Sequence, residues 1–133
     1  LVRAFTAAEL AEREAALRAA ASETEARFPG SRIQVRCQPS YRNMALKVAE
    51  APKVVDFALE AIRRQDLTPL RRPIRGGTDG ARLSYMGLLT PNLFTGAQGY
   101  HSVHEWASLA WMSASVECCL QIVNVWREKS AGY

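Results

Sequence analysis

The sequence predicts an α/β fold that is preceded by part of an α+β unit. Strand-like and helix-like patterns alternate after about residue 45, and such alternation is typical of α/β proteins. Before that point, residues 32–38 alternate polar and apolar side chains, which indicates a strand with one face in a core and the other in water. The 133-residue chain is 48% hydrophobic and 23% charged, a composition that indicates a globular rather than a disordered protein.

The first unit contains a predicted helix over residues 7–27. Thr6-Ala7-Ala8-Glu9 has the spacing of a capping box, in which the Thr and Glu side chains each satisfy a backbone N–H at a helix start. Pro29-Gly30 ends the helix. We expect residues 1–5 to be the end of a strand beside residues 32–38, with the helix crossing between the two.

The second unit is predicted to begin near residues 42–46, where the character of the sequence changes. Pro52 fits the first turn of a helix, because the N–H that proline lacks would be unpaired there anyway. A domain boundary is therefore expected within residues 42–46. The elements expected in the second unit are helices over 52–65, from Thr78 or Asp79 onward and over 103–128, and strands over 70–74 and 92–95.

The helix over residues 103–128 carries apolar side chains around an unusually wide arc. Its start is assigned to Ser102-Val103-His104-Glu105, which again has the spacing of a capping box. A helix that is apolar over so wide an arc needs more neighbours than this chain provides. Its two adjacent stripes are Leu109, Met112, Val116, Cys119 and Val123, and Trp111, Cys118, Ile122 and Val125.

Composition narrows the class of protein. The net charge of +4 has its densest patch at Arg71, Arg72 and Arg75, but no interleaved aromatics or nucleic-acid-binding motif accompany it, so we expect no nucleic-acid partner. No apolar run reaches the roughly 18 residues of a membrane span, so we expect no membrane insertion. The three cysteines match neither a disulfide framework nor a zinc motif, which favours a reducing compartment and hence the cytoplasm. A start at Leu1 indicates a fragment of a longer product.

A turn that could bind an anion lies at Arg75-Gly76-Gly77-Thr78-Asp79. A strand is expected to end there and a helix to begin, with its N–H groups facing the turn, and the arginine fork pairs with carboxylates. The alternative is an ordinary strand-to-helix turn in which Thr78 or Asp79 caps the helix.

His101 is the candidate metal ligand. If a helix begins at residue 103, the positive end of its dipole keeps the imidazole neutral, which is the form that binds zinc. The alternative is a loop histidine bonded to backbone. His104 and Glu105 do not fit the His-Glu-x-x-His zinc helix, so we assign them to support of the loop. A catalytic zinc needs three protein ligands, and this segment alone does not supply them.

Three motifs together resemble the C-terminal segment of the peptidase T family, the aminotripeptidases among the co-catalytic zinc exopeptidases. The resemblance extends over essentially the whole chain and is strongest from residue 73 to residue 105. The motifs are Pro73-Ile74-Arg75-Gly76-Gly77-Thr78-Asp79-Gly80, Asn92-Leu93-Phe94-Thr95-Gly96 and Tyr100-His101-Ser102-Val103-His104-Glu105.

This resemblance implies a catalytic α/β domain that holds two zinc ions and is interrupted by a smaller α+β lid, through which the enzyme forms a homodimer. Residues 1–44 would be part of the lid, and residues 45–133 the C-terminal part of the di-zinc catalytic domain. By the same resemblance His101 is a zinc ligand, while Arg75 grips the carboxylate of a short peptide substrate with the help of Gly76, Gly77 and Thr78. Arg3 and Asn43 match lid positions that contact substrate. Asp79 supports the turn.

The other ligands and the general base lie outside this sequence in such enzymes, so the resemblance implies that the fragment alone is inactive. Two alternatives stay open. One is a related zinc exopeptidase, of the aminoacylase or carboxypeptidase type. The other is a fragment that acts only in folding or dimerisation.

Overall fold

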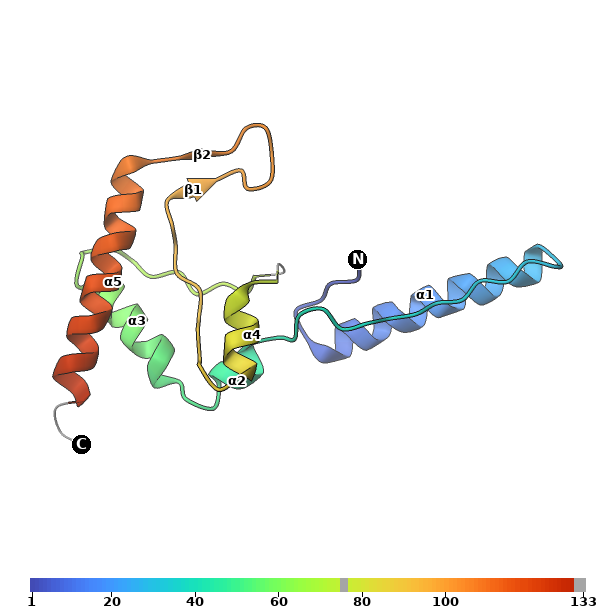
Figure 1. The fold of residues 1–133 in the computed structure, drawn as a ribbon, viewed down its shortest axis with the longest axis horizontal. Helices are drawn as coiled ribbons and strands as arrows, with labels where there is room; N and C mark the ends of the chain where they lie inside the picture. The colour runs from blue at the N-terminus through green and yellow to red at the C-terminus, as the bar shows by residue number, and fades with distance from the viewer. Residues whose placement is uncertain (75–76, 131–133) are drawn as a thin grey trace.

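The computed structural model describes residues 1–74 and 77–130, and these are mostly helical (Figure 1). A single antiparallel sheet of two short strands accompanies the helices in this part of the chain. The elements are α1 (Ala7–Arg27), α2 (Ala45–Val48), α3 (Lys53–Arg63), α4 (Asp79–Tyr85), β1 (Ala97–Gln98), β2 (Trp106–Ala107) and α5 (Leu109–Ser130). The predicted mixture of helix and strand is present, but the strand content is much smaller than expected.

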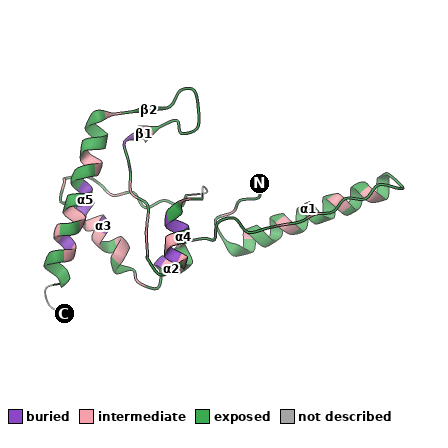
Figure 2. Ribbon diagram, viewed as in Figure 1, coloured by how far each residue is buried: buried purple, intermediate pink, exposed green. Residues whose placement is uncertain are grey.

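Helix α1 has the predicted bounds and the predicted start. The Thr6 hydroxyl accepts a hydrogen bond from the Glu9 N–H at 3.2 Å, and the Glu9 carboxylate accepts one from the Thr6 N–H at 3.4 Å, which completes the capping box. The helix projects from the rest of the chain as an arm, and none of its residues is buried (Figures 1 and 2). The segment directly after it in the chain runs back along it (Figure 1).

The predicted strand over residues 32–38 is wrong, although its alternation of faces is right. The segment runs back along α1 without strand pairing, and Val35 and Cys37 are half-buried while Gln34 and Arg36 are exposed (Figure 1). A guanidinium N–H of Arg18 donates to the Val35 carbonyl at 3.2 Å, so α1 side chains occupy backbone groups of the segment. A strand needs the backbone of a second strand, and no described segment, residues 1–5 included, pairs with this one.

Helices α3 and α5 pack together around the core. Ala61 on α3 and Cys118 and Val125 on α5 are fully buried, and Figure 2 shows buried positions where the two helices meet. The rings of Phe57 and Trp126 meet edge to face, with centroids 4.8 Å apart. The predicted helix over residues 52–65 is confirmed by α3, and the burial of its apolar face explains its stability.

An ion cluster links the same two helices and makes their packing sensitive to pH. Arg64 pairs with Glu60 at 2.7 Å and in a bidentate manner with Glu128 at 2.7 and 3.1 Å, and Lys129 also pairs with Glu60. Hydrogen bonds from Lys129 and then Arg64 lower the pKa of Glu60, and a hydrogen bond from Arg64 lowers the pKa of Glu128. Because both folded pKa values are depressed, the cluster stabilises the protein above the ordinary glutamate value near 4.5 and stops doing so as the pH falls through the folded values.

We therefore expect the thermal midpoint of unfolding to decrease between about pH 6 and about pH 3, and to decrease less in the double variant Glu60→Gln, Glu128→Gln. Differential scanning calorimetry across this range measures the two slopes. The difference should be modest, because the cluster is partly exposed. Identical slopes for the wild type and the double variant would contradict the assignment.

Two further predicted strands, over residues 70–74 and 92–95, are also absent from the described structure. The strands that do form are β1 and β2, which pair Ala97 with Ala107 and Gln98 with Trp106. Residues 70–74 and 92–95 lack a strand partner, so their strand propensity is not realised.

Helix α5 begins at Leu109 rather than at residue 103. The Ser108 hydroxyl accepts a hydrogen bond from the Trp111 N–H at 3.4 Å, and the Ser108 carbonyl accepts one from the Met112 N–H at 2.9 Å. Ser108 therefore supplies the cap that was assigned to Ser102.

One face of α5 carries large apolar side chains that nothing in the described structure covers. Their exposed fractions range from 46% for Met112 to 79% for Leu109. The predicted excess of apolar surface on this helix is thus confirmed. The side chains are those of Leu109, Met112, Val116, Leu120 and Val123. No helix of the described residues has the length and hydropathy to cross a membrane.

Candidate functional site

The predicted anion-binding turn lies directly before α4. Arg75 and Gly76 fall outside the described residues, so the structure places only the second half of the turn. Thr78 has an extended backbone, with φ −131° and ψ 157°, and Asp79 is the first residue of the helix. The Thr78 Oγ1 atom is buried and has no hydrogen-bond partner among the residues that the structure describes, so Thr78 precedes α4 without capping it through its side chain.

A glycine inside α4 fixes where this turn lies. A Cβ atom on Gly80 would lie 2.4 Å from the Thr90 carbonyl oxygen, a distance that no side chain tolerates. The start of α4 is therefore pressed against the segment at residues 90–92. The sequence motif contains Gly80 but does not by itself assign it a role. The signal that could have revealed this role is a glycine in the first turn of a helix, where it is unfavourable unless packing requires it.

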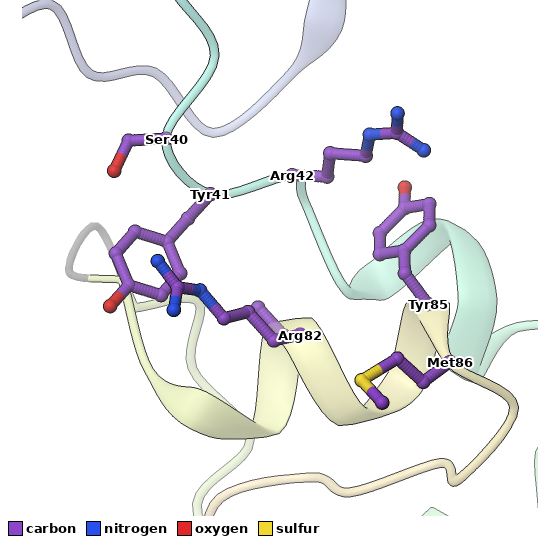
Figure 3. Close-up of a pocket in the computed structure, with 7 residues that line it drawn as sticks. Ser40, Tyr41, Arg42, Arg82, Tyr85 and Met86 are labelled. Carbon is purple, nitrogen blue, oxygen red and sulfur yellow. The ribbon is translucent and has the colours of Figure 1, made fainter.

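Tyr41 covers the glycine of the turn. A Cβ atom on Gly77 would lie 2.2 Å from the Tyr41 ring, so the ring occupies the space that a side chain would need. The Arg82 guanidinium lies over the same ring, 5.0 Å from its centroid (Figure 3). Residues 40–43 are thereby fixed against α4 and the turn.

Asn43 joins three segments of the chain. Its side-chain amide donates to the Phe5 carbonyl at 2.7 Å, and its side-chain oxygen accepts from the Ala45 N–H at 2.9 Å at the start of α2. Its backbone carbonyl accepts a hydrogen bond from the Tyr85 hydroxyl at 3.1 Å. Asn43 therefore holds the beginning of the chain, α2 and α4 together.

Arg3, Asn43 and Gly77 line one groove of about 1740 Å³. The Arg3 carbonyl accepts a hydrogen bond from the Arg13 guanidinium, which holds its backbone near the base of α1. Of the predicted substrate-binding residues, these three are brought together. The described part of the groove lining does not include Thr78.

His101 lies in the loop between β1 and β2. Its backbone is in the left-handed region, with φ +64°, and its N–H donates to the Glu105 carboxylate at 3.1 Å. The Ser102 hydroxyl donates to the Gly99 carbonyl at 2.7 Å and accepts from the His104 N–H at 3.1 Å. The loop is thus closed by its own hydrogen bonds.

The observed start of α5 removes the helix-dipole effect that the sequence led us to expect at His101. Because α5 begins at Leu109, His101 does not lie directly before a helix N-terminus, and the helix dipole does not account for a neutral imidazole. Glu105 bonds the backbone of the His101 loop instead of capping a helix.

The hairpin is fixed to the first turns of α5. Gly96 has φ +85°, and a Cβ atom there would lie 2.6 Å from the Met112 nitrogen. The Ser108 N–H donates to the Gly96 carbonyl at 3.0 Å, and the Ser115 hydroxyl donates to the Phe94 carbonyl at 2.7 Å. The position of the His101 loop therefore depends on a close approach of two backbones.

The groove extends to the hairpin that carries His101, because Gly96 and Gln98 are among its lining residues. His101, His104 and Glu105 belong to the hairpin at the top of Figure 1 and are not among the described residues that line the groove. Within residues 1–74 and 77–130, no group of three His, Cys, Asp or Glu side chains could hold a metal ion. The loop of the hairpin carries two exposed histidines, His101 and His104, and the predicted ligand His101 can contribute only one ligand to a metal whose other ligands lie elsewhere.

Comparisons with known proteins supply the context. No protein-family model matches the chain. It is 38% identical over 124 residues to a peptidase T of Vibrio cholerae, a match that covers 93% of this chain and 30% of the relative. It is 35% identical over 130 residues to a peptidase T of Bacillus velezensis, covering 98% of this chain and 32% of the relative. A peptidase T of Salmonella arizonae is 46% identical over 97 residues, covering 73% of this chain and 24% of the relative. The chain therefore spans about a third or less of the length of these relatives.

Proposed function

The chain belongs to the peptidase T family, and from this premise we propose that it is the C-terminal portion of a zinc-dependent aminopeptidase that removes the N-terminal residue from tripeptides. The observation that carries the proposal is the 35–38% identity to peptidase T over 93–98% of the chain. In the intact enzyme the substrate is a short peptide.

Residues 1–44 form part of a lid domain, and residues 45–133 form the C-terminal part of the catalytic domain. The arm-like position of α1 supports this division, because α1 contributes nothing to the core that α3 and α5 share (Figure 2). The lid mediates a homodimer. Free Cys37, Cys118 and Cys119 fit a reducing compartment such as the cytoplasm.

The groove at the base of the arm receives the peptide. Arg75 and Gly76, with Gly77 and Thr78, hold its carboxylate, and Arg3 and Asn43 contact it from the lid. The Asn43 amide has two N–H donors, and its hydrogen bond to Phe5 uses one, so the other can donate to a peptide carbonyl. The buried Thr78 hydroxyl, which has no hydrogen-bond partner among the described residues, fits a turn whose polar groups are completed by a ligand.

His101 contributes one zinc ligand, and Glu105, His104 and Asp79 support the two loops. The hydrogen bond from the His101 N–H to Glu105 supports this role, since it fixes the loop backbone while leaving the exposed imidazole accessible. Zinc in such an enzyme activates water and polarises the scissile carbonyl. The remaining ligands and the general base belong to the rest of the protein, so we expect the 133-residue segment alone to bind zinc weakly and to hydrolyse nothing.

Product analysis on defined peptides tests the proposal. The intact protein, loaded with zinc, should convert a tripeptide into its N-terminal amino acid and a dipeptide, and should act much more slowly on dipeptides, tetrapeptides and N-acetylated amino acids. Removal of zinc by a chelator should abolish the reaction and re-addition should restore it. Chromatography of the products identifies which bond is cut.

The controls separate the alternatives. Release of the C-terminal residue, or hydrolysis of N-acetylated amino acids in preference to tripeptides, would indicate a carboxypeptidase or aminoacylase instead. An intact, zinc-loaded protein that hydrolyses none of these substrates would contradict every hydrolase assignment and would favour a role in folding or dimerisation.

A further inference from the structure

A small pocket of about 290 Å³ lies between residues 40–42 and residues 81–86, which belong to α4 and its C-terminal cap. Tyr41 and Arg42 contribute from the first segment, and Arg82 and Tyr85 from the helix. Figure 3 shows the four side chains around the opening, with Arg82 beside Tyr41 and Arg42 beside Tyr85. The lining is mainly apolar and includes no acidic side chain among the described residues.

Both arginines lie within cation–π distance of a tyrosine ring. The Arg82 guanidinium lies 5.0 Å from the centroid of the Tyr41 ring, and the Arg42 guanidinium lies 5.1 Å from that of Tyr85. A contact between a guanidinium and a ring uses no hydrogen-bond acceptor, so the N–H groups of the arginine stay available. The ring contacts therefore orient the two cations without occupying their hydrogen-bond donors.

Neither guanidinium has an acidic partner in the described part of the chain. The ion pairs and side-chain hydrogen bonds found there involve other residues. Lys47, the third cation near Tyr85, is already paired with Glu50 at 2.8 Å. The two cations lie at different sides of the pocket (Figure 3), and a carboxylate that enters it would be stabilised by charge-assisted hydrogen bonds from a guanidinium.

The walls of the pocket indicate what kind of anion fits. Tyrosine rings, Ala81 and Met86 form apolar surface that suits the methylene stem of an acidic side chain better than a bare inorganic anion. The pocket also adjoins the groove at the base of the arm, because Tyr41, Arg42 and Ala81 line both. Tyr41 covers Gly77 of the predicted substrate turn.

We propose that this pocket is a subsite for the carboxylate of an aspartate or glutamate side chain in the peptide substrate. The substrate assignment rests on the proposed peptidase function, whereas the capacity of the pocket to bind a carboxylate does not. The subsite would give the enzyme a preference for acidic tripeptides, set by residues outside the metal centre.

Two measurements on the intact protein test separately whether the pocket binds a carboxylate and whether it acts as a substrate subsite. Isothermal titration with glutarate tests carboxylate binding without any turnover, and kcat/KM for matched tripeptides that contain Glu or Gln at the same position tests the preference. The variants are Arg42→Gln, Arg82→Gln and their double variant. Arg63→Gln on α3 is the matched control, because it removes the same charge from an exposed residue that does not line the pocket.

We expect saturable glutarate binding that weakens roughly tenfold or more in the double variant and is unchanged in Arg63→Gln. The preference for Glu over Gln should fall by a similar factor in the double variant, mainly through KM. Arg42→Lys and Arg82→Lys should restore it only in part, because lysine keeps the charge but loses the planar fork.

If glutarate does not bind, or binds equally strongly to the double variant, the pocket is not a carboxylate site. Glutarate binding with equal kcat/KM for Glu and Gln peptides at every position would overturn its role as a substrate subsite. If no tripeptide is hydrolysed at all, the proposed function fails, and the titration still decides whether the pocket binds a carboxylate.

Discussion

Replacing His101 by asparagine in the intact protein is expected to lower kcat/KM for tripeptide hydrolysis by at least about 100-fold, because loss of an outer-shell partner alone costs up to that factor. Asparagine tolerates the left-handed backbone at this position, where φ is +64°, better than most residues do. The amide is a poor zinc ligand. The effect should therefore report the loss of an imidazole rather than a distorted loop, and bound zinc should fall in parallel.

His104→Asn is the matched control for this experiment. His104 lies in the same loop, is exposed, and contributes its backbone N–H to Ser102, which the substitution preserves. We expect its activity and zinc content to stay close to the wild type, and the circular dichroism spectra of both variants to be unchanged. A His101→Asn protein that retains full zinc content and activity would show that His101 is an ordinary loop histidine.

Gly96→Ala is expected to be the most destabilising single substitution in the hairpin, at about 3 kcal/mol or more. A non-glycine residue in the left-handed region costs about 1–2 kcal/mol, and forced overpacking adds about 1–3 kcal/mol. Both terms apply here, since φ is +85° and the new Cβ would lie 2.6 Å from the Met112 nitrogen and 2.8 Å from the Trp111 Cβ. The partner atoms include backbone, so they cannot simply rotate away.

The substitution Gly30→Ala separates the cost of backbone strain from the cost of overpacking. Gly30 has nearly the same dihedral, φ +89°, but no atom lies within 4 Å of the position of its Cβ. Its cost should be only about 1 kcal/mol, from backbone strain alone. Chemical denaturation of the intact protein and both variants measures the two values. Equal losses of stability would mean that Gly96 matters only for its dihedral. Gly96→Ala should also impair tripeptide hydrolysis, because it displaces the His101 loop from α5.

Helices were largely predictable from the sequence because their hydrogen bonds are local. The bounds of α1 depend on a capping box and a Pro-Gly stop, and those of α3 on its apolar face. The strands predicted over residues 32–38, 70–74 and 92–95 were not found, because a strand depends on a distant partner that pattern alone does not supply. The side chains of residues 34–37 still alternate between exposed and half-buried positions, although the segment pairs with no other strand.

The two capping-box spacings show why local motifs are ambiguous. Thr6 and Glu9 cap α1, whereas Ser102 and Glu105 have the same spacing and instead close the loop that carries His101. The residues that follow each glutamate decide whether the spacing starts a helix or closes a loop. Strong helix formers come after Glu9, while the residues after Glu105 pair with β1 until Ser108 offers a second cap.

The roles assigned to the candidate site residues stay predictions, and their arrangement could not be derived from the sequence. Arg3, Asn43 and Gly77 line one groove, which also reaches Gln98 of the hairpin that carries His101. The contacts of Tyr41 with Gly77 and Arg82 could not be foreseen, because they depend on packing between segments far apart in sequence. Gly80 and Gly96 matter for the same reason, since each marks a close approach of distant backbone.

The uncovered face of α5 has a practical consequence for anyone who produces the 133-residue segment by itself. Leu109, Val116 and Val123 follow one another at intervals of two helical turns and form a continuous apolar stripe along α5. Exposed apolar stripes of this kind promote self-association in water. Expression yield and colloidal behaviour would then depend on these side chains, whereas the melting temperature would depend on the opposite side of the helix, around Cys118 and Val125. Polar substitutions at Leu109, Val116 and Val123 are expected to improve the solubility of the isolated segment while leaving its core intact.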